Sequence, residues 1–308
     1  MPRRLRYVPP GGALVEVTCR TLQARLLLRP SPLLREITLG ILGRAQRLSG
    51  VAIHAFVFLA NHYHLLVSVS DAAQLAKFVG FLNSNLAREV GRIHEWQERL
   101  WGRRYQAILV SEEEESQVER LLYLARQGCK EGLVADPMEW PGATSWQAML
   151  DGRPLEGTWF DRTAEGLVRR KGVEFGAREF ASPETVMLSP LPAWAHLGPE
   201  VRRERLRELL DLVRAEAQAM RQETGREPLG REAAMRQDPH WSPARSKKGP
   251  APLVHAASRE VRRVYQEAFR LFTAAYRRAA EALRAGGDPI FPEGCFPPPG
   301  PFLRPATA

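Results

Sequence analysis

Residues 51–69, VAIHAFVFLANHYHLLVSV, constrain the fold more than any other part of the chain. The segment is rich in Val, Ile, Phe and Leu, which fit the pleated, buried surface of a β-sheet. Ala60-Asn61 interrupts the apolar run, and Asn is common in turns. We therefore expect two antiparallel strands, at about 51–59 and 62–69, joined by a tight turn.

His62 and His64 lie two residues apart on the second of these strands. Side chains alternate between the two faces of a strand, so both imidazoles point the same way. Two imidazoles on a rigid strand can hold one metal ion. The alternative is a pair of semi-buried histidines that are bonded to their neighbours.

Tyr123 and Gln127 lie four residues apart in a segment with a helical pattern, so they share one face of that helix. The alternative for Tyr123 is a core aromatic residue whose hydroxyl finds one partner. Together with the histidine pair, this helix offers a phenol and an amide to a common site.

Two segments carry a resemblance to a known family. LANHYHLLVSV is similar to the HUH motif (His, bulky hydrophobic residue, His) of single-tyrosine transposases. ERLLYLARQGCKEGLVADPMEWPGATSW resembles the following part of the REP-associated tyrosine transposases and their insertion-sequence relatives. The resemblance covers roughly residues 5–150. The chain departs from the family at Ala60, where Pro is frequent, and at Gln127-Gly128-Cys129-Lys130, which replaces Asn-Pro-Val-Arg.

The resemblance implies an α+β fold, with a ferredoxin-like antiparallel sheet of four to five strands and packed helices (the HUH endonuclease palm). It implies that Tyr123 is the nucleophile, and that His62, His64 and Gln127 bind Mg²⁺ or Mn²⁺. The substrate would be single-stranded or hairpin DNA, joined to the protein through a 5′-phosphotyrosine. In this family the Tyr helix acts within one subunit or across two, so a homodimer is one expected state.

Charge agrees with a polyanionic partner. The formal net charge is +9, and Arg is more frequent than Lys. Arg forms planar, bidentate contacts to phosphate. Arg103 and Arg104 stand at the mouth of a strand expected within residues 101–110, where they are candidates for nucleic-acid binding. Ordinary surface charge is the alternative for both.

The remaining pattern predicts a strand at 13–20, helices near 32–50, 72–93 and 112–128, and two domains. Residues 1–150 would form the HUH single-tyrosine transposase-like catalytic domain. Residues 151–308 would form a basic, mostly helical C-terminal extension that ends in a Pro/Gly-rich tail. Within this extension we expect a basic linker at 242–252 and a long helix at 256–284.

Cysteine usage and hydropathy point to the cytoplasm. The three cysteines, Cys19, Cys129 and Cys295, form no CxxC pair, so neither a zinc ribbon nor a disulfide framework is expected. The N-terminal residues do not have the pattern of a signal peptide, and no apolar run is long enough to cross a bilayer. No membrane partner is therefore expected.

Three functions remain open on the sequence. The first is a metal-dependent endonuclease and strand transferase of the transposase type. The second is a domesticated DNA-binding protein that keeps the fold but no longer cuts. The third is a replication initiator or relaxase, although these usually carry longer His clusters or a helicase domain. The general base is not identifiable, and His54 and His94 are the only candidates we name.

Overall fold

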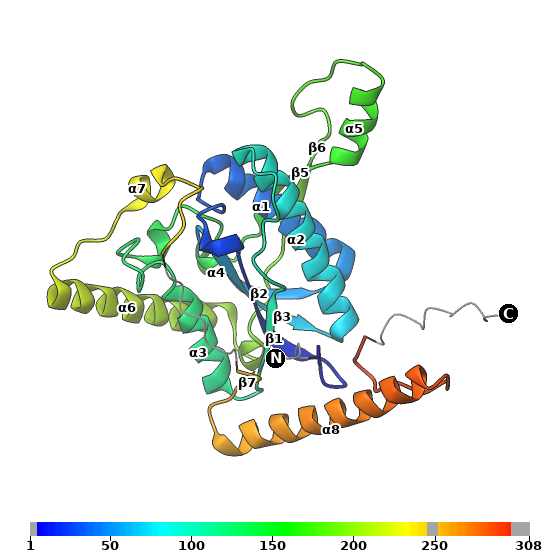
Figure 1. Ribbon diagram of the computed structural model, residues 1–308. Coiled ribbons are helices and arrows are strands. Elements are labelled where there is room, and N and C mark those ends of the chain that lie inside the picture. Colours follow the sequence, from blue (N-terminus) through cyan, green and yellow to red (C-terminus); the bar gives the residue numbers. More distant parts are fainter. Residues whose placement is uncertain (1–4, 245–251, 297–308) are drawn as a thin grey trace.

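A five-stranded sheet with the strand order β2-β3-β1-β4-β7 forms the centre of the molecule (Figure 1). The computed structural model describes residues 5–244 and 252–296, so most of the predicted linker and the end of the predicted tail lie outside the described residues. The strands are β1 (Ala13–Arg20), β2 (Ala52–Phe58), β3 (His62–Val69), β4 (Gln106–Val110) and β7 (Val254–His255).

The predicted α+β class is confirmed. β1 pairs antiparallel with both β3 and β4, and β2 pairs antiparallel with β3, as expected for the palm. β7 is the exception, because this two-residue strand from the C-terminal half pairs parallel with β4. The sheet is therefore mixed, which the sequence did not indicate.

β3 is buried on both faces, and the alternation of its side chains separates two cores. Tyr63, Leu65 and Val67 pack in the core that contains α1 (Pro32–Ser49) and α2 (Ala72–His94). Leu66 packs in the second core with α3 (Glu114–Ala125). His62 and His64 share the parity of Leu66, so the sheet presents both imidazoles to α3.

Local signals set the ends of the helices. The Ser31 hydroxyl accepts a hydrogen bond from the Leu34 amide at 3.1 Å at the start of α1, and Asp71 caps the Gln74 amide at 2.7 Å at the start of α2. α1 ends at Gly50, whose φ of 70° is left-handed and suits a residue without Cβ. These caps fix how both helices cover one face of the sheet.

Residues after 150 add elements on both sides of this palm. β5 (Leu155–Phe160) and β6 (Ala181–Val186) form a hairpin that lies along α1, with α5 (Arg162–Arg170) at its far end (Figure 1). Gly40 of α1 contacts the β5 backbone so closely that an added Cβ would lie 2.1 Å from the carbonyl of Thr158. The sequence missed this hairpin because Gly and charged residues interrupt the strand pattern there.

Three further helices complete the C-terminal half. α6 (Pro199–Thr224) packs beside α3, and Arg126 of α3 forms an ion pair with Glu216 of α6 at 2.5 Å. α8 (Arg259–Arg284) follows β7 and extends past the edge of the sheet (Figure 1). The remaining elements are α4 (Trp146–Asp151), α7 (Arg231–Arg236) and the 3-10 turns Leu22–Ala24, Pro137–Glu139 and Pro192–Trp194. No helix in the described ranges could span a membrane.

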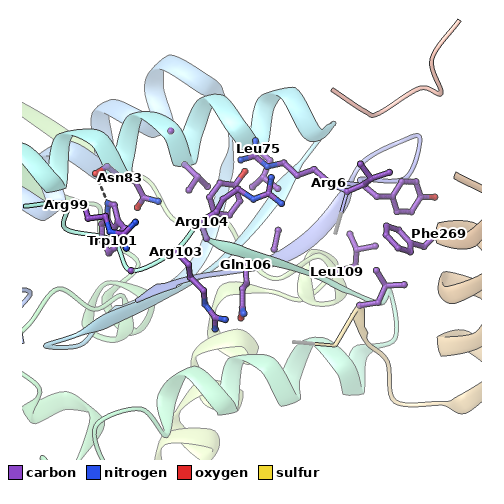
Figure 2. Close-up of a pocket in the computed structure, with 18 residues that line it drawn as sticks. Arg6, Leu75, Asn83, Arg99, Trp101, Arg103, Arg104, Gln106, Leu109 and Phe269 are labelled. Carbon is purple, nitrogen blue, oxygen red and sulfur yellow. Dashed lines mark hydrogen bonds between the residues drawn. The ribbon is translucent and has the colours of Figure 1, made fainter. Parts of the chain in front are cut away.

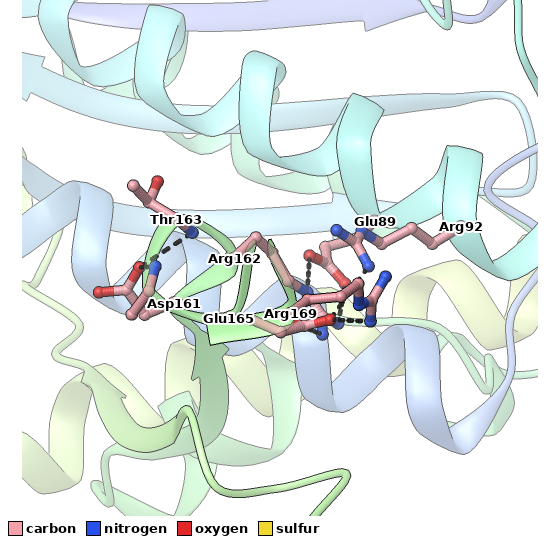
Figure 3. Close-up of polar contacts among 8 residues, drawn as sticks. Glu89, Arg92, Asp161, Arg162, Thr163, Glu165 and Arg169 are labelled. Atoms are coloured by element: carbon pink, nitrogen blue, oxygen red, sulfur yellow. Dashed lines mark hydrogen bonds and ion pairs between the residues drawn. The ribbon is translucent and has the colours of Figure 1, made fainter. Parts of the chain in front are cut away.

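A network of ion pairs joins α5 to α2 (Figure 3). The guanidinium of Arg162 donates to both carboxylate oxygens of Glu89, at 2.7 and 2.6 Å, and also to Glu165 at 2.5 Å. Hydrogen bonding to Glu89 raises the pKa of Arg162 further above its usual value. Because Glu89 is only 5% exposed, its carboxylate depends on this bidentate partner, and the hairpin is held against α2.

Candidate active site

A cavity of about 460 Å³ lies between the sheet and α3, and the predicted site residues gather in it. His62 and His64 enter from β3, while Tyr123 and Gln127 enter from the helix and its C-terminal end. Arg103 and Arg104, in the segment before β4, line the same cavity. Residues from three separate parts of the chain are thus brought to one place.

Tyr123 lies beside the histidine pair. The ring centroids of Tyr123 and His64 are 5.4 Å apart and the planes are nearly perpendicular, at 80°. The centroids of His62 and His64 are 5.1 Å apart. Two cations also lie over the phenol ring, with the Arg120 guanidinium carbon 4.8 Å and the Lys130 nitrogen 4.1 Å from its centroid. Cation–π attraction holds both positive charges against the ring, on the wall of the cavity.

A buried carboxylate holds His64. Glu16 of β1 is 2% exposed, and its Oε1 lies 2.8 Å from Nδ1 of His64. Its Oε2 lies 3.0 Å from Nε2 of His255, which belongs to β7. Burial alone would raise the pKa of Glu16, but contacts with His255 and His64 outweigh it and hold the pKa well below its usual range. Glu16 is therefore an anion that fixes the orientation of the His64 ring.

His62 lies between two amides, and a backbone carbonyl fixes each amide. Nδ1 of His62 is 2.6 Å from Oδ1 of Asn61, whose amide nitrogen donates to the Ala24 carbonyl at 3.2 Å. The Gln127 amide nitrogen donates to the Tyr123 carbonyl at 3.0 Å. Burial first, and then the charge of neighbouring groups, holds the pKa of His62 well below its usual value, although a hydrogen bond with Gln127 opposes this. His62 is therefore neutral near pH 7.

The two histidines named as base candidates lie elsewhere. His54 is bonded through Nδ1 to the Pro190 carbonyl at 2.7 Å and through Nε2 to the Ser68 hydroxyl at 2.7 Å. Neither His54 nor His94 lines the Tyr123 cavity. His255, which is outside the HxH pair, lines the same cavity as Tyr123.

Sequence reasoning missed four residues of this site: Glu16, Arg120, Lys130 and His255. Glu16 occupies a polar position of an alternating strand, which normally indicates a solvated face. Arg120 and Lys130 look like ordinary helix-surface charges. His255 gives no local signal, because its strand has only two residues and lies 132 positions after Tyr123.

Residues 31–127 match the family model described as "Transposase IS200 like". This span includes the histidine pair, Tyr123 and Gln127, and the match confirms the resemblance to tyrosine transposases for this part of the chain. It supports a transposase-type protein that processes DNA. None of the curated proteins matches the chain.

Two solved structures are similar to the molecule. One is described as a REP-associated tyrosine transposase bound to a REP hairpin, with 16% identity, a TM-score of 0.42, and coverage of 49% of this chain and 86% of that one. The other is a candidate transposase from Deinococcus radiodurans R1, with 19% identity, a TM-score of 0.28, and coverage of 40% and 96%.

Proposed function

We propose that this protein cleaves and rejoins single-stranded DNA, with Tyr123 as the nucleophile and with His62, His64 and Gln127 as ligands of Mg²⁺ or Mn²⁺. The observation that carries the proposal is the common cavity, in which the Tyr123 ring lies 5.4 Å from the His64 ring. Single-stranded DNA that includes a hairpin is the proposed substrate, as the sequence resemblance implies.

The donor set fits a divalent cation. Nδ1 of His62 is hydrogen-bonded to the side-chain oxygen of Asn61, and Nδ1 of His64 to that of Glu16. Nε2 of each ring can therefore act as a metal ligand. The Gln127 amide nitrogen is engaged by a carbonyl, which leaves the amide oxygen for the metal. No group of three or more His, Cys, Asp or Glu in the described part of the chain could hold a metal ion, and the proposed third ligand, the Gln127 amide, is outside these residue types. Mixed imidazole and oxygen ligands suit Mn²⁺ and also Mg²⁺.

The reaction is a transesterification at phosphorus. The Tyr123 oxygen forms a bond to the phosphorus while the bond from phosphorus to the 3′-oxygen breaks, and the phenol proton is transferred so that a free 3′-hydroxyl is left. A bound divalent ion supplies Lewis-acid stabilisation of charge on the phosphate. Arg120 and Lys130, which lie over the phenol ring, stabilise the same charge. The phosphotyrosine link conserves the bond energy, and a 3′-hydroxyl can therefore reverse the step.

A panel of single-stranded hairpin oligonucleotides tests the proposal. Incubation with Mn²⁺ should give a covalent protein–DNA species that resists denaturing electrophoresis, and a chelator should abolish it. Binding of the same oligonucleotides without nicking or adduct, at any Mn²⁺ concentration, would instead establish the non-cleaving DNA-binding protein. Three single variants test the proposed metal ligands: His62→Ala, His64→Ala and Gln127→Ala. Each should fail to form the covalent protein–DNA adduct but should still bind the oligonucleotide.

A further inference from the structure

A second and larger cavity, of about 910 Å³, lies on the opposite side of β4 from Tyr123. Of the residues of this strand, Ile108 lines the Tyr123 cavity, Ala107 and Leu109 line the second one, and Gln106 lines both. Its other walls come from α2, from the N-terminal segment and from Phe269 of α8. Figure 2 shows Arg103 and Gln106 on one side of the strand and Arg6 on the other.

The second cavity concentrates positive charge. Its lining includes Arg6, Arg99, Arg103 and Arg104, and the described residues that line it include no Asp or Glu. We call it the arginine cavity. Among the described residues, Arg6, Arg99 and Arg103 form no ion pair. Guanidinium groups that converge in a concave site without carboxylates raise the local concentration of an anion, and their planar shape suits phosphate.

Aromatic side chains stand among these arginines. The Trp101 indole nitrogen donates to the Asn83 carbonyl at 2.9 Å, which fixes the ring in the wall. The Arg6 guanidinium lies 4.7 Å from the centroid of the Tyr105 ring. The Tyr105 hydroxyl is buried and has no hydrogen-bond partner within the described ranges. Single-strand binding sites combine basic groups with aromatic rings in the same way.

The two cavities adjoin each other and share part of their lining. Arg103, Arg104 and Gln106 line both of them, at the point where the chain enters β4. β7 pairs with β4 only at Leu109 and Val110, so it does not pair with this end of the strand. A nucleic-acid strand that has one phosphate at Tyr123 can therefore continue past residues 103–106 to the arginine cavity.

We propose that the arginine cavity binds a nucleotide of the single strand that flanks the phosphate at Tyr123. The proposal rests on the function proposed above, since it assigns a second subsite to the same substrate. A volume of about 910 Å³ is within the range of ordinary ligand sites, roughly 300–1,000 Å³, and can hold a base with its phosphate. Arg6 and Arg99 bind the phosphate, while the wall formed by Trp101 and Tyr105 contacts the base.

The double variant Arg6→Gln/Arg99→Gln tests this subsite, because both residues line the arginine cavity and neither lines the Tyr123 cavity. Its matched control is Arg178→Gln/Arg236→Gln, which removes the same charge from side chains that are 64% and 75% exposed and paired with glutamates. Affinity for an oligonucleotide that forms the adduct is measured over a range of salt concentrations. All variants carry Tyr123→Phe, so that binding is observed without reaction.

Loss of the contacts to this one phosphate should lower the salt slope by about 0.7, which is the contribution of one neutralised phosphate of a single strand, and should weaken binding about fivefold at 0.1 M salt. The control should change affinity less than threefold. A 2-aminopurine scan adds a second readout: one position next to the cleaved phosphate should be quenched on binding, and the double variant should lose that quenching.

The outcomes separate this inference from the proposed function. If the unmodified protein forms the adduct but the double variant binds like the control, or no single position is quenched, the subsite is refuted and the catalytic proposal stands. If no oligonucleotide forms an adduct while the double variant still weakens binding to single strands selectively, the catalytic proposal fails and the cavity is a nucleic-acid site nonetheless. Circular dichroism melts verify that all variants are folded.

Discussion

Replacing Glu16 by Gln should weaken metal binding although Glu16 is not a proposed ligand. The change keeps the shape of the side chain but removes the charge that lies 2.8 Å from Nδ1 of His64. A charge-assisted hydrogen bond then becomes a neutral one, which contributes roughly half as much. Loss of a partner that orients a metal-binding histidine typically lowers metal affinity about 10–100-fold, or roughly 1.4–2.7 kcal/mol.

The assay is a titration with Mn²⁺ alone, in which electron paramagnetic resonance reports the free ion. Glu119→Gln is the matched control, because Glu119 forms an ion pair with Arg120 at 2.7 Å but is 60% exposed and does not line the cavity. We expect a change of less than twofold for this control. His255→Gln, at the other oxygen of Glu16, should give a smaller loss of affinity in the same direction. An unchanged Mn²⁺ dissociation constant in a folded Glu16→Gln variant would refute the role assigned to this carboxylate.

Two further predictions concern stability. Gly40→Ala should destabilise the fold by about 1–3 kcal/mol or more in urea unfolding, because its Cβ would meet the β5 backbone at 2.1 Å. Gly80→Ala is the control and should be neutral or stabilising, because a Cβ at this helical position meets nothing within 4 Å. Equal effects of the two substitutions would contradict the close packing at Gly40. Burial lowers the pKa of His94 to about 4, so the unfolded chain binds more protons than the folded one between about pH 6.5 and 4. The free energy of unfolding should therefore decrease as the pH is lowered from about 6.5 to 4. It should decrease less steeply in His94→Gln, and parallel curves of unfolding free energy against pH for the two proteins would contradict this prediction.

The sequence was sufficient for the palm because each element there carries a local signal. The apolar run at 51–69 has strand composition and a turn residue, and Asp71 and Gly50 are recognisable as helix ends. The histidine pair and the Tyr helix could be placed on the same side of the sheet from periodicity and from the family resemblance. Their approach within one cavity follows from the parity of β3.

The parts that could not be predicted depend on contacts between distant residues. β7 is a two-residue strand that exists only because it pairs with β4, and it brings His255 to Glu16. The hairpin of β5 and β6 is fixed by close backbone packing on Gly40, which no periodicity reveals. The boundary between the two predicted domains, at residue 150, remains a prediction.

The identity of the residue that becomes linked to DNA tests the central claim most directly. Trypsin cleaves after Arg120 and Arg126, so Tyr123 is released in the short peptide LLYLAR. After reaction with a hairpin oligonucleotide and Mn²⁺, nuclease digestion and mass spectrometry should find a nucleotide joined through its 5′-phosphate to Tyr123 in this peptide, and Tyr123→Phe should abolish it. A nucleotide on the peptide of Tyr63 or Tyr105, or an adduct that persists in Tyr123→Phe, would contradict the account.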